Sequence, residues 1–154
     1  DHRDLHSFPT RRSSDLKKPF KLIKFRTMDV NTKSVASHLA SQAQVTKFGT
    51  FLRNSKLDEL PQLINVLVGD MSLVGARPCL FNQTELIEER EKRGVYNYLP
   101  GITGLGQINN VDMSTPEKLA ELDAEMYQTM SISNYFKYII GTVSGKGQGD
   151  ALKK

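Results

Sequence analysis

Two adjacent carboxylates at the start of an apolar stripe, in SKLDELPQLINVL (residues 55–67), constrain the fold of this chain more than any other feature. The apolar side chains recur at i, i+3, i+4 and i+7, as Leu60, Leu63, Ile64 and Leu67. This spacing predicts one face of an amphipathic helix. Because Pro61 lacks an N–H and is tolerated in the first helical turn, we expect the helix to begin near Asp58.

Asp58 and Glu59 would then lie at the positive end of the helix dipole. One interpretation is ordinary N-capping, since acidic residues are common there and contribute about 0.5–2 kcal/mol. The other interpretation is an acidic functional site at a helix N-terminus. This stretch alone leaves both open.

Composition limits the chemistry that the chain can carry. It has 154 residues, enough for one domain with a core, and its net charge of +4 favours anionic partners such as nucleotides, phosphates or acidic membrane surfaces. A single cysteine, Cys79, excludes a disulfide framework and a cysteine metal site. No apolar run reaches 18 residues, so we expect no conventional membrane span in these residues.

Residues 1–16 are expected to be non-native. The run SFPTRRSSDL (residues 7–16) matches one reading frame of a widely used short-read sequencing adaptor and has no apolar periodicity. The alternative is a genuine disordered tail. With this segment set aside, His38 is the one remaining histidine, which makes a Ser-His-Asp triad or a histidine-rich zinc site hard to build. Carboxylates, lysines and arginines must then carry any chemistry.

The basic segment KKPFKLIKFRTM (residues 17–28) has five positive charges and no acid, and it is predicted to form a short strand. On a period of two, Lys24 and Arg26 share a face with Phe20 and Leu22. Two cations at neighbouring positions of one face can clamp a phosphate. The alternative is a solvated edge strand whose lysines prevent aggregation.

Between this segment and the acidic pair, residues 29–46 are polar and are expected to form a loop or an irregular helix. Thr46 is predicted to cap a helix at 47–54, which would bring Arg53 close to Asp58. The residues of this helix expected to face inward are Phe48, Phe51 and Leu52.

Another arginine follows the acidic helix, in GDMSLVGARP (residues 69–78). Gly69 is expected to end the helix, and Gly75 and Pro78 indicate a loop. Arg77 on such an irregular backbone could bind an anion or a carboxylate, or it could be a free surface charge.

Helices are further predicted at 84–94, 114–130 and 132–143. The last has an apolar stripe, typical of a core but also compatible with a membrane interface, formed by Ile132, Tyr135, Phe136, Ile139, Ile140 and Val143. The glycine-rich run at 99–110 could hold a phosphate or form a tight turn. Since helices outnumber strands and no βαβ alternation appears, we expect a mostly helical α+β domain with a short strand or hairpin, not a Rossmann-like sheet.

Taken together, four motifs resemble the bacterial sugar transferase family, the monotopic polyprenyl-phosphate phosphoglycosyl transferases that begin O-antigen, capsule, exopolysaccharide and other glycan assembly. The motifs are KFRTM (24–28), LRNSKLDELPQLINVL (52–67), GDMSLVGARP (69–78) and PGITGLGQIN (100–109). The resemblance covers residues 17–154, which it identifies as a partial catalytic domain.

The resemblance implies transfer of a sugar 1-phosphate from a UDP-sugar to polyprenyl (undecaprenyl) phosphate, with release of UMP. It implies a requirement for Mg²⁺, attachment to the cytoplasmic face of the bacterial inner membrane, and no nucleic-acid partner. The family's acidic dyad maps onto Asp58, the nucleophile that forms a covalent phosphosugar intermediate, and Glu59, the metal ligand. The family's substrate- or phosphate-binding residues map onto Arg53, Arg77, Lys24, Arg26, Gln107 and Asn109.

Three departures from the family pattern qualify these expectations. The family begins with a hydrophobic re-entrant membrane helix, which we expect to be missing from this chain. The usual Pro-Arg-Pro reads Ala76-Arg77-Pro78, and the usual Gly-Arg-Asn reads Asn110-Val111-Asp112, which lacks the arginine.

Two other functions are compatible with parts of the sequence. One is a catalytically inactive homologue that acts as a membrane or glycan-assembly scaffold. The other is a nucleic-acid-binding module, because residues 17–26 interleave phenylalanines with cations. No recognised nucleic-acid-reading motif accompanies that segment, which makes this second alternative the weaker one.

Overall fold

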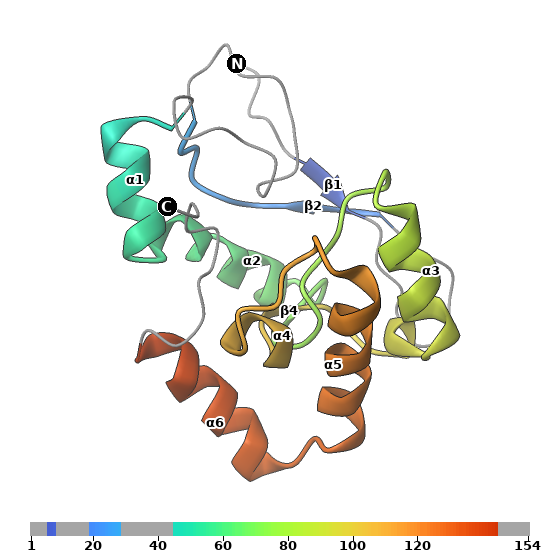
Figure 1. Cartoon of the computed structure of the whole chain (residues 1–154). Coiled ribbons are helices and arrows are strands. Elements are labelled where there is room, and N and C mark those ends of the chain that lie inside the picture. Colours follow the sequence, from blue (N-terminus) through green and yellow to red (C-terminus); the bar gives the residue numbers. More distant parts are fainter. Residues whose placement is uncertain (1–5, 9–18, 29–44, 145–154) are drawn as a thin grey trace.

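The computed structural model of the chain describes residues 6–8, 19–28 and 45–144, and Figure 1 shows the arrangement of their elements. Nearly all of the predicted loop or irregular helix over 29–46 lies outside the described residues. The same is true of most of residues 1–16, whose non-native origin stays a prediction.

Two short antiparallel strands, β1 (His6–Phe8) and β2 (Phe20–Leu22), form the first sheet. The strand predicted in the basic segment is therefore confirmed, but it ends at Leu22, so the expectation that Lys24 and Arg26 lie on its face is wrong. Beyond Leu22 the main chain bonds to a side chain instead of a neighbouring strand, because the Ile23 N–H donates to Asn65 Oδ1 at 3.1 Å.

Helix α1 (Lys47–Asn54) has the predicted bounds, and Thr46 Oγ1 caps it by accepting from the Gly49 N–H at 2.9 Å. Leu52 is buried as expected, whereas the expectation that Phe48 and Phe51 face inward is wrong, since both are more than half exposed. The inward face instead contains Gly49, which packs so closely on the basic segment that an added Cβ would lie 2.0 Å from the Thr27 carbonyl oxygen.

The acidic pair lies in a 3₁₀ turn, η3 (Leu57–Glu59), which leads into α2 (Gln62–Leu67). The predicted start near Asp58 is correct for this helical turn, but the α-helix itself begins at Gln62. Pro61 is the N-cap of α2 with a φ of −62°, a position at which its missing N–H costs no intrahelical bond.

Helix α2 is amphipathic but turns its polar face inward. Asn65 is 2% exposed, its Oδ1 accepts from Ile23, and its Nδ2 donates to the Lys21 carbonyl oxygen at 2.8 Å. The amide thus satisfies main-chain groups that β2 leaves without a strand partner. The apolar face is exposed at Leu60, Leu63, Ile64 and Leu67.

A second sheet, which sequence analysis did not predict, pairs β3 (Ser72–Val74) with β4 (Gly101–Thr103) in parallel. Helix α3 (Thr84–Lys92) and the 3₁₀ turn η4 (Val95–Asn97) form the crossover, so a small βαβ unit is present where none was expected. An added Cβ on Gly101 would lie 2.0 Å from the Gly75 nitrogen. Glycines of the 99–110 run therefore permit close main-chain packing.

The C-terminal third consists of α4 (Leu105–Ile108), α5 (Pro116–Gln128) and α6 (Ile132–Val143). The bounds of α6 match the prediction, and α5 begins at Pro116, two residues after the start of the predicted range. The predicted stripe of α6 divides between core and solvent. Its exposed members are Ile132, Phe136, Ile140 and Val143.

The core of the described residues consists of small clusters between these elements. One cluster joins Leu86 of α3 to Leu119 and Ala120 of α5, and another joins Val74 of β3 to Met126 of α5. Helices around two short sheets confirm the expected α+β class. Within the part of the chain that is described, no helix combines the length and the apolarity that a membrane span requires.

Because β3 and β4 touch through their main chains, Gly101→Ala is expected to destabilise the fold by about 1–3 kcal/mol, the usual cost of overpacking. The new methyl group would meet the Gly75 main chain, which cannot rotate away as a side chain can. Urea unfolding followed by circular dichroism measures the change.

Gly141→Ala is the matched control. An added Cβ there meets its nearest neighbour, the Ile108 side chain, at 3.4 Å, and the site is helical, so its stability should be equal or higher. Equal stability of the Gly101→Ala variant and the parent would show that the two strands are not held this closely.

Candidate active site

The acidic pair is buried and is neutralised by cations from distant segments. Asp58 and Glu59 are 4% and 9% exposed, and buried carboxylates are unfavourable unless they are paired. Arg77 Nη2 lies 2.6 Å from Glu59 Oε1, and Lys24 Nζ lies 3.6 Å from the same oxygen. The segment after β2, the turn η3 and the loop after β3 therefore meet at Glu59.

The basic segment is also attached to the acidic pair through its main chain. The Phe25 N–H donates to the Asp58 carbonyl oxygen at 3.1 Å. This bond holds Lys24 beside the pair although no strand continues to it. Arg26, the next predicted phosphate ligand, is exposed at the surface.

Lys56 begins the turn that carries the pair, in the left-handed conformation with a φ of 56°. Its Nζ donates to the Thr142 carbonyl oxygen at 3.2 Å, which joins η3 to the end of α6. Burial lowers the pKa of Lys56, and the nearby Glu59 carboxylate partly opposes this change. A further positive group therefore lies close to the acidic pair.

Arg53 is placed by Thr27, a residue that sequence analysis did not select. Arg53 is 6% exposed, and its Nε donates to Thr27 Oγ1 at 2.9 Å. Its Nη1 is buried without a hydrogen-bond acceptor among the described residues. Leaving a buried donor unsatisfied is unfavourable by about 1–3 kcal/mol, so this nitrogen is suited to an anionic ligand.

Gln107 and Asn109 are not joined to the acidic pair by any hydrogen bond in the described residues. Gln107 Nε2 donates to the Ile102 carbonyl oxygen at 3.1 Å, and Asn109 Nδ2 donates to the Leu105 carbonyl oxygen at 3.0 Å. Both amides thus support α4 and its junction with β4. Their predicted role at the substrate stays a prediction.

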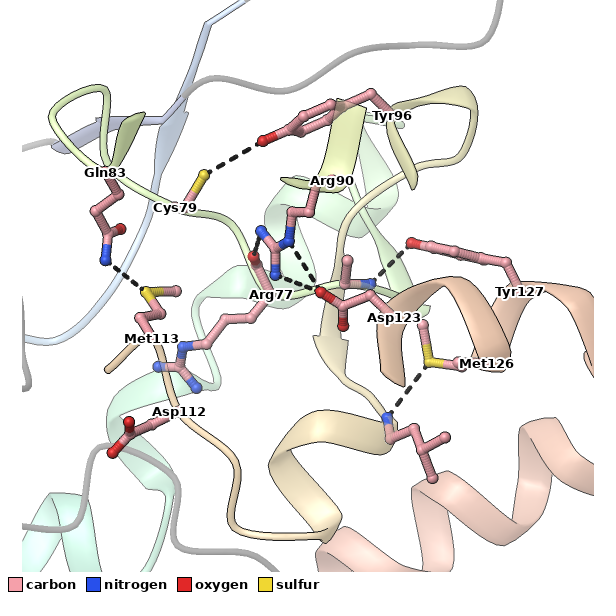
Figure 2. Close-up of polar contacts among 12 residues, drawn as sticks. Arg77, Cys79, Gln83, Arg90, Tyr96, Asp112, Met113, Asp123, Met126 and Tyr127 are labelled. Carbon is pink, nitrogen blue, oxygen red and sulfur yellow. Dashed lines mark hydrogen bonds and ion pairs between the residues drawn. The ribbon is translucent and has the colours of Figure 1, made fainter. Parts of the chain in front are cut away.

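A buried ion pair lies behind Arg77, and sequence analysis missed it. Figure 2 shows Arg90 and Asp123 on one side of the Arg77 main chain, while the Arg77 guanidinium points away from them, toward Asp112. Asp123 occupies a position four residues after Leu119, on the buried face of α5. An acid on an apolar helix face is a sequence signal for a buried partner.

The donor set at the pair fits Mg²⁺ bound together with a substrate. The described residues contain no cluster of three or more His, Cys, Asp or Glu side chains. Mg²⁺ does not need such a cluster, because it commonly uses one or two carboxylates with substrate phosphates and water. Both cations that pair with Glu59 contact Oε1, so this carboxylate already lies among positive groups that could share it with a metal and a phosphate.

Comparison with known proteins identifies relatives of the chain. It is 46% identical over 106 residues to an uncharacterized sugar transferase of Bacillus subtilis, EpsL, covering 69% of this chain and 52% of that protein. It is 42% identical over 137 residues to the UDP-glucose:undecaprenyl-phosphate glucose-1-phosphate transferase of Escherichia coli, covering 82% of this chain and 29% of that protein. It is 36% identical over 138 residues to the galactosyl transferase CpsE of Streptococcus agalactiae, covering 80% of this chain and 30% of that protein.

The chain thus spans about half of EpsL and less than a third of the other two proteins. A family model described as bacterial sugar transferase matches residues 4–147, which is nearly the whole chain. This chain belongs to the bacterial sugar transferase family.

Proposed function

We propose that this chain transfers a sugar 1-phosphate from a UDP-sugar to polyprenyl phosphate, for which undecaprenyl phosphate is the expected carrier, and releases UMP. The observation that carries the proposal is the buried Asp58–Glu59 pair, whose Glu59 is held by Arg77 and Lys24. Such a site combines a carboxylate nucleophile with positive charge for a diphosphate. The name of the Escherichia coli relative supports this donor and acceptor class.

Asp58 acts as the nucleophile in the first step. A carboxylate oxygen attacks the β-phosphorus of the UDP-sugar, and an Asp58–phosphate bond forms. The bond from that phosphorus to the UMP oxygen breaks, and UMP leaves with the electron pair. The product is an aspartyl phosphosugar, a mixed anhydride with a good leaving group.

The lipid acceptor reacts in the second step. A phosphate oxygen of polyprenyl phosphate attacks the same phosphorus, and the Asp58–phosphate bond breaks. The electron pair returns to the carboxylate, so the enzyme is regenerated and polyprenyl-diphosphate-sugar is released. Neither step requires an oxidant, a reductant or a net proton transfer.

The neighbouring cations make attack by one anion on another possible. Arg77 and Lys24 already meet a carboxylate oxygen, and Arg53 presents a buried donor that has no acceptor within the described part of the chain. These groups position and neutralise the diphosphate. Glu59 would hold Mg²⁺, which when bound would add positive charge at the phosphate oxygens.

We further propose that the protein works at the cytoplasmic face of the bacterial inner membrane. Figure 1 shows α1 and α6 on the left of the view and α3 on the right. Helices α1, α2 and α6 all carry exposed apolar side chains, which we propose form one apolar face: Phe48, Phe51, Leu63, Ile64, Leu67, Ile132, Phe136, Ile140 and Val143. A lipid acceptor and a net charge of +4 favour an anionic membrane as the partner of this face.

Asp58→Asn is expected to abolish the covalent intermediate and to lower UMP release on the order of 10⁴-fold or more, as when a covalent nucleophile is removed. The chain is incubated with Mg²⁺ and a panel of UDP-sugars without lipid. Intact mass then shows a sugar-phosphate adduct on the parent and none on the variant.

Glu121→Gln, which changes an exposed carboxylate on α5, is the control and should keep the adduct. An adduct that persists in Asp58→Asn would exclude Asp58 as the nucleophile. Absence of UMP release from every donor, even with polyprenyl phosphate, would favour the inactive scaffold.

Chelation of divalent cations is expected to stop transfer, and added Mg²⁺ should restore it. Because Glu59 is the proposed ligand, Glu59→Gln should raise the Mg²⁺ concentration for half-maximal rate by at least about tenfold. Initial rates across a Mg²⁺ titration measure this. An unchanged Mg²⁺ dependence in Glu59→Gln would remove Glu59 from the metal site.

Leu67→Glu is expected to weaken binding to anionic vesicles by about tenfold or more, since inserting one leucine contributes about 1.5–3 kcal/mol. Leu67 is 86% exposed, so its replacement should leave the folded chain intact. Vesicle co-sedimentation measures binding, with Gln128→Glu, an exposed position on α5, as a control of equal added charge. Equal loss in both variants would indicate a general charge effect.

A further inference from the structure

A buried ion pair behind Arg77 has no part in the chemistry proposed above. Arg90 of α3 and Asp123 of α5 are 1% and 2% exposed. Arg90 Nε lies 2.9 Å and Nη2 lies 2.7 Å from Asp123 Oδ2. Burial opposes the charge on Arg90, but Asp123, Cys79 and Tyr96 together raise the pKa of the guanidinium. Burial also raises the pKa of Asp123, and Arg90 opposes that change. The 2.7 Å contact between the guanidinium and the carboxylate makes the two side chains a buried pair.

Stability alone does not account for this pair. A buried ion pair usually stabilises a fold no more than apolar side chains of similar size, because both charges lose their hydration. Arg90, however, makes one contact that an apolar residue could not make. Its Nη1 donates to the Arg77 carbonyl oxygen at 2.8 Å.

The preceding residue is held from the same helix. Tyr127 lies one turn after Asp123 on α5, and its hydroxyl accepts from the Ala76 N–H at 2.8 Å. The same hydroxyl donates to the Leu99 carbonyl oxygen at 2.8 Å. Figure 2 shows Tyr127 approaching the chain around Arg77 from α5, while Arg90 approaches the Arg77 main chain on the side opposite the Arg77 guanidinium. Two consecutive residues, Ala76 and Arg77, are thus fixed through their main chains.

These contacts determine where the Arg77 side chain begins. With its main chain held on one side, the guanidinium extends to the other side and reaches Glu59 Oε1 at 2.6 Å. A displacement of about 1 Å in a substrate-positioning group can cost about 100-fold in rate. Fixing the Arg77 main chain therefore matters for any anion that the side chain binds.

We propose that Arg90, held by Asp123 and assisted by Tyr127, is a positioning residue that sets the orientation of Arg77 without touching the substrate. The effect on catalysis rests on the proposed sugar-phosphate transfer. The effect on the Arg77 main chain does not, and it can be measured separately.

The main test removes both charges together, with Arg90→Met/Asp123→Leu, because a single replacement would leave an unpaired buried charge. The unfolding temperature should stay near that of the parent. Amide hydrogen exchange in peptides covering residues 75–79 should become at least about tenfold faster, and kcat should fall about 10- to 100-fold. Arg90→Lys, which keeps one donor, should recover part of the loss.

The control is Arg93→Met, at the residue that directly follows α3, where the arginine pairs with Glu89. It should change neither exchange at 75–79 nor kcat. Tyr127→Phe removes one hydroxyl and should speed exchange at the Ala76 amide, so it decides the question if the double variant does not fold.

Parent-like exchange at 75–79 in the double variant and in Tyr127→Phe would overturn the inference. A fall in kcat with parent-like exchange would also overturn the inference, because the lower rate would then not result from a less firmly held Arg77 main chain. If the parent itself transfers no sugar phosphate, the proposed function fails, and exchange alone still decides whether Arg90 holds this loop.

Discussion

The burial of two neighbouring carboxylates, Asp58 and Glu59, is the constraint on which the rest of this structure depends. Two adjacent negative charges removed from water are unfavourable unless positive groups surround them. Arg77 and Lys24 supply charge at Glu59, and they arrive from segments on opposite sides of it in the sequence. The turn η3, the basic segment and the loop after β3 can therefore take up their places only together.

Local sequence signals predicted the helices well but not the direction in which they face. Thr46 indicates where α1 begins, because capping depends on adjacent residues. Periodicity identifies an apolar face without saying whether that face is buried in the protein, and the exposed stripe of α2 shows this. The parallel pairing of β3 with β4 was missed because each strand has three residues and its partner is distant in sequence.

The residues of the candidate site were also predicted only in part. Resemblance to a family selected Lys24 and Arg77, and the structure brings both to Glu59. Thr27 and Arg90 were missed because their contribution is a contact made across the fold, which neither spacing nor residue type reveals. Asp123 carried a signal, since an acid at a buried helical position requires a partner, but the sequence does not say which partner.

An arginine that is held through its carbonyl oxygen keeps its guanidinium available for an anion, whereas one that is held through its guanidinium does not. Arg77 accepts from Arg90 through its carbonyl oxygen, while its guanidinium contacts Glu59. In the proposed reaction, a diphosphate can replace the Glu59 carboxylate as the anionic partner of the Arg77 guanidinium, or both anions can bind it. The loop that carries Arg77 stays in place in either case. Positive charge that is already oriented needs little reorganisation when charge shifts during phosphoryl transfer. The buried ion pair would thus serve the chemistry by keeping the Arg77 main chain still.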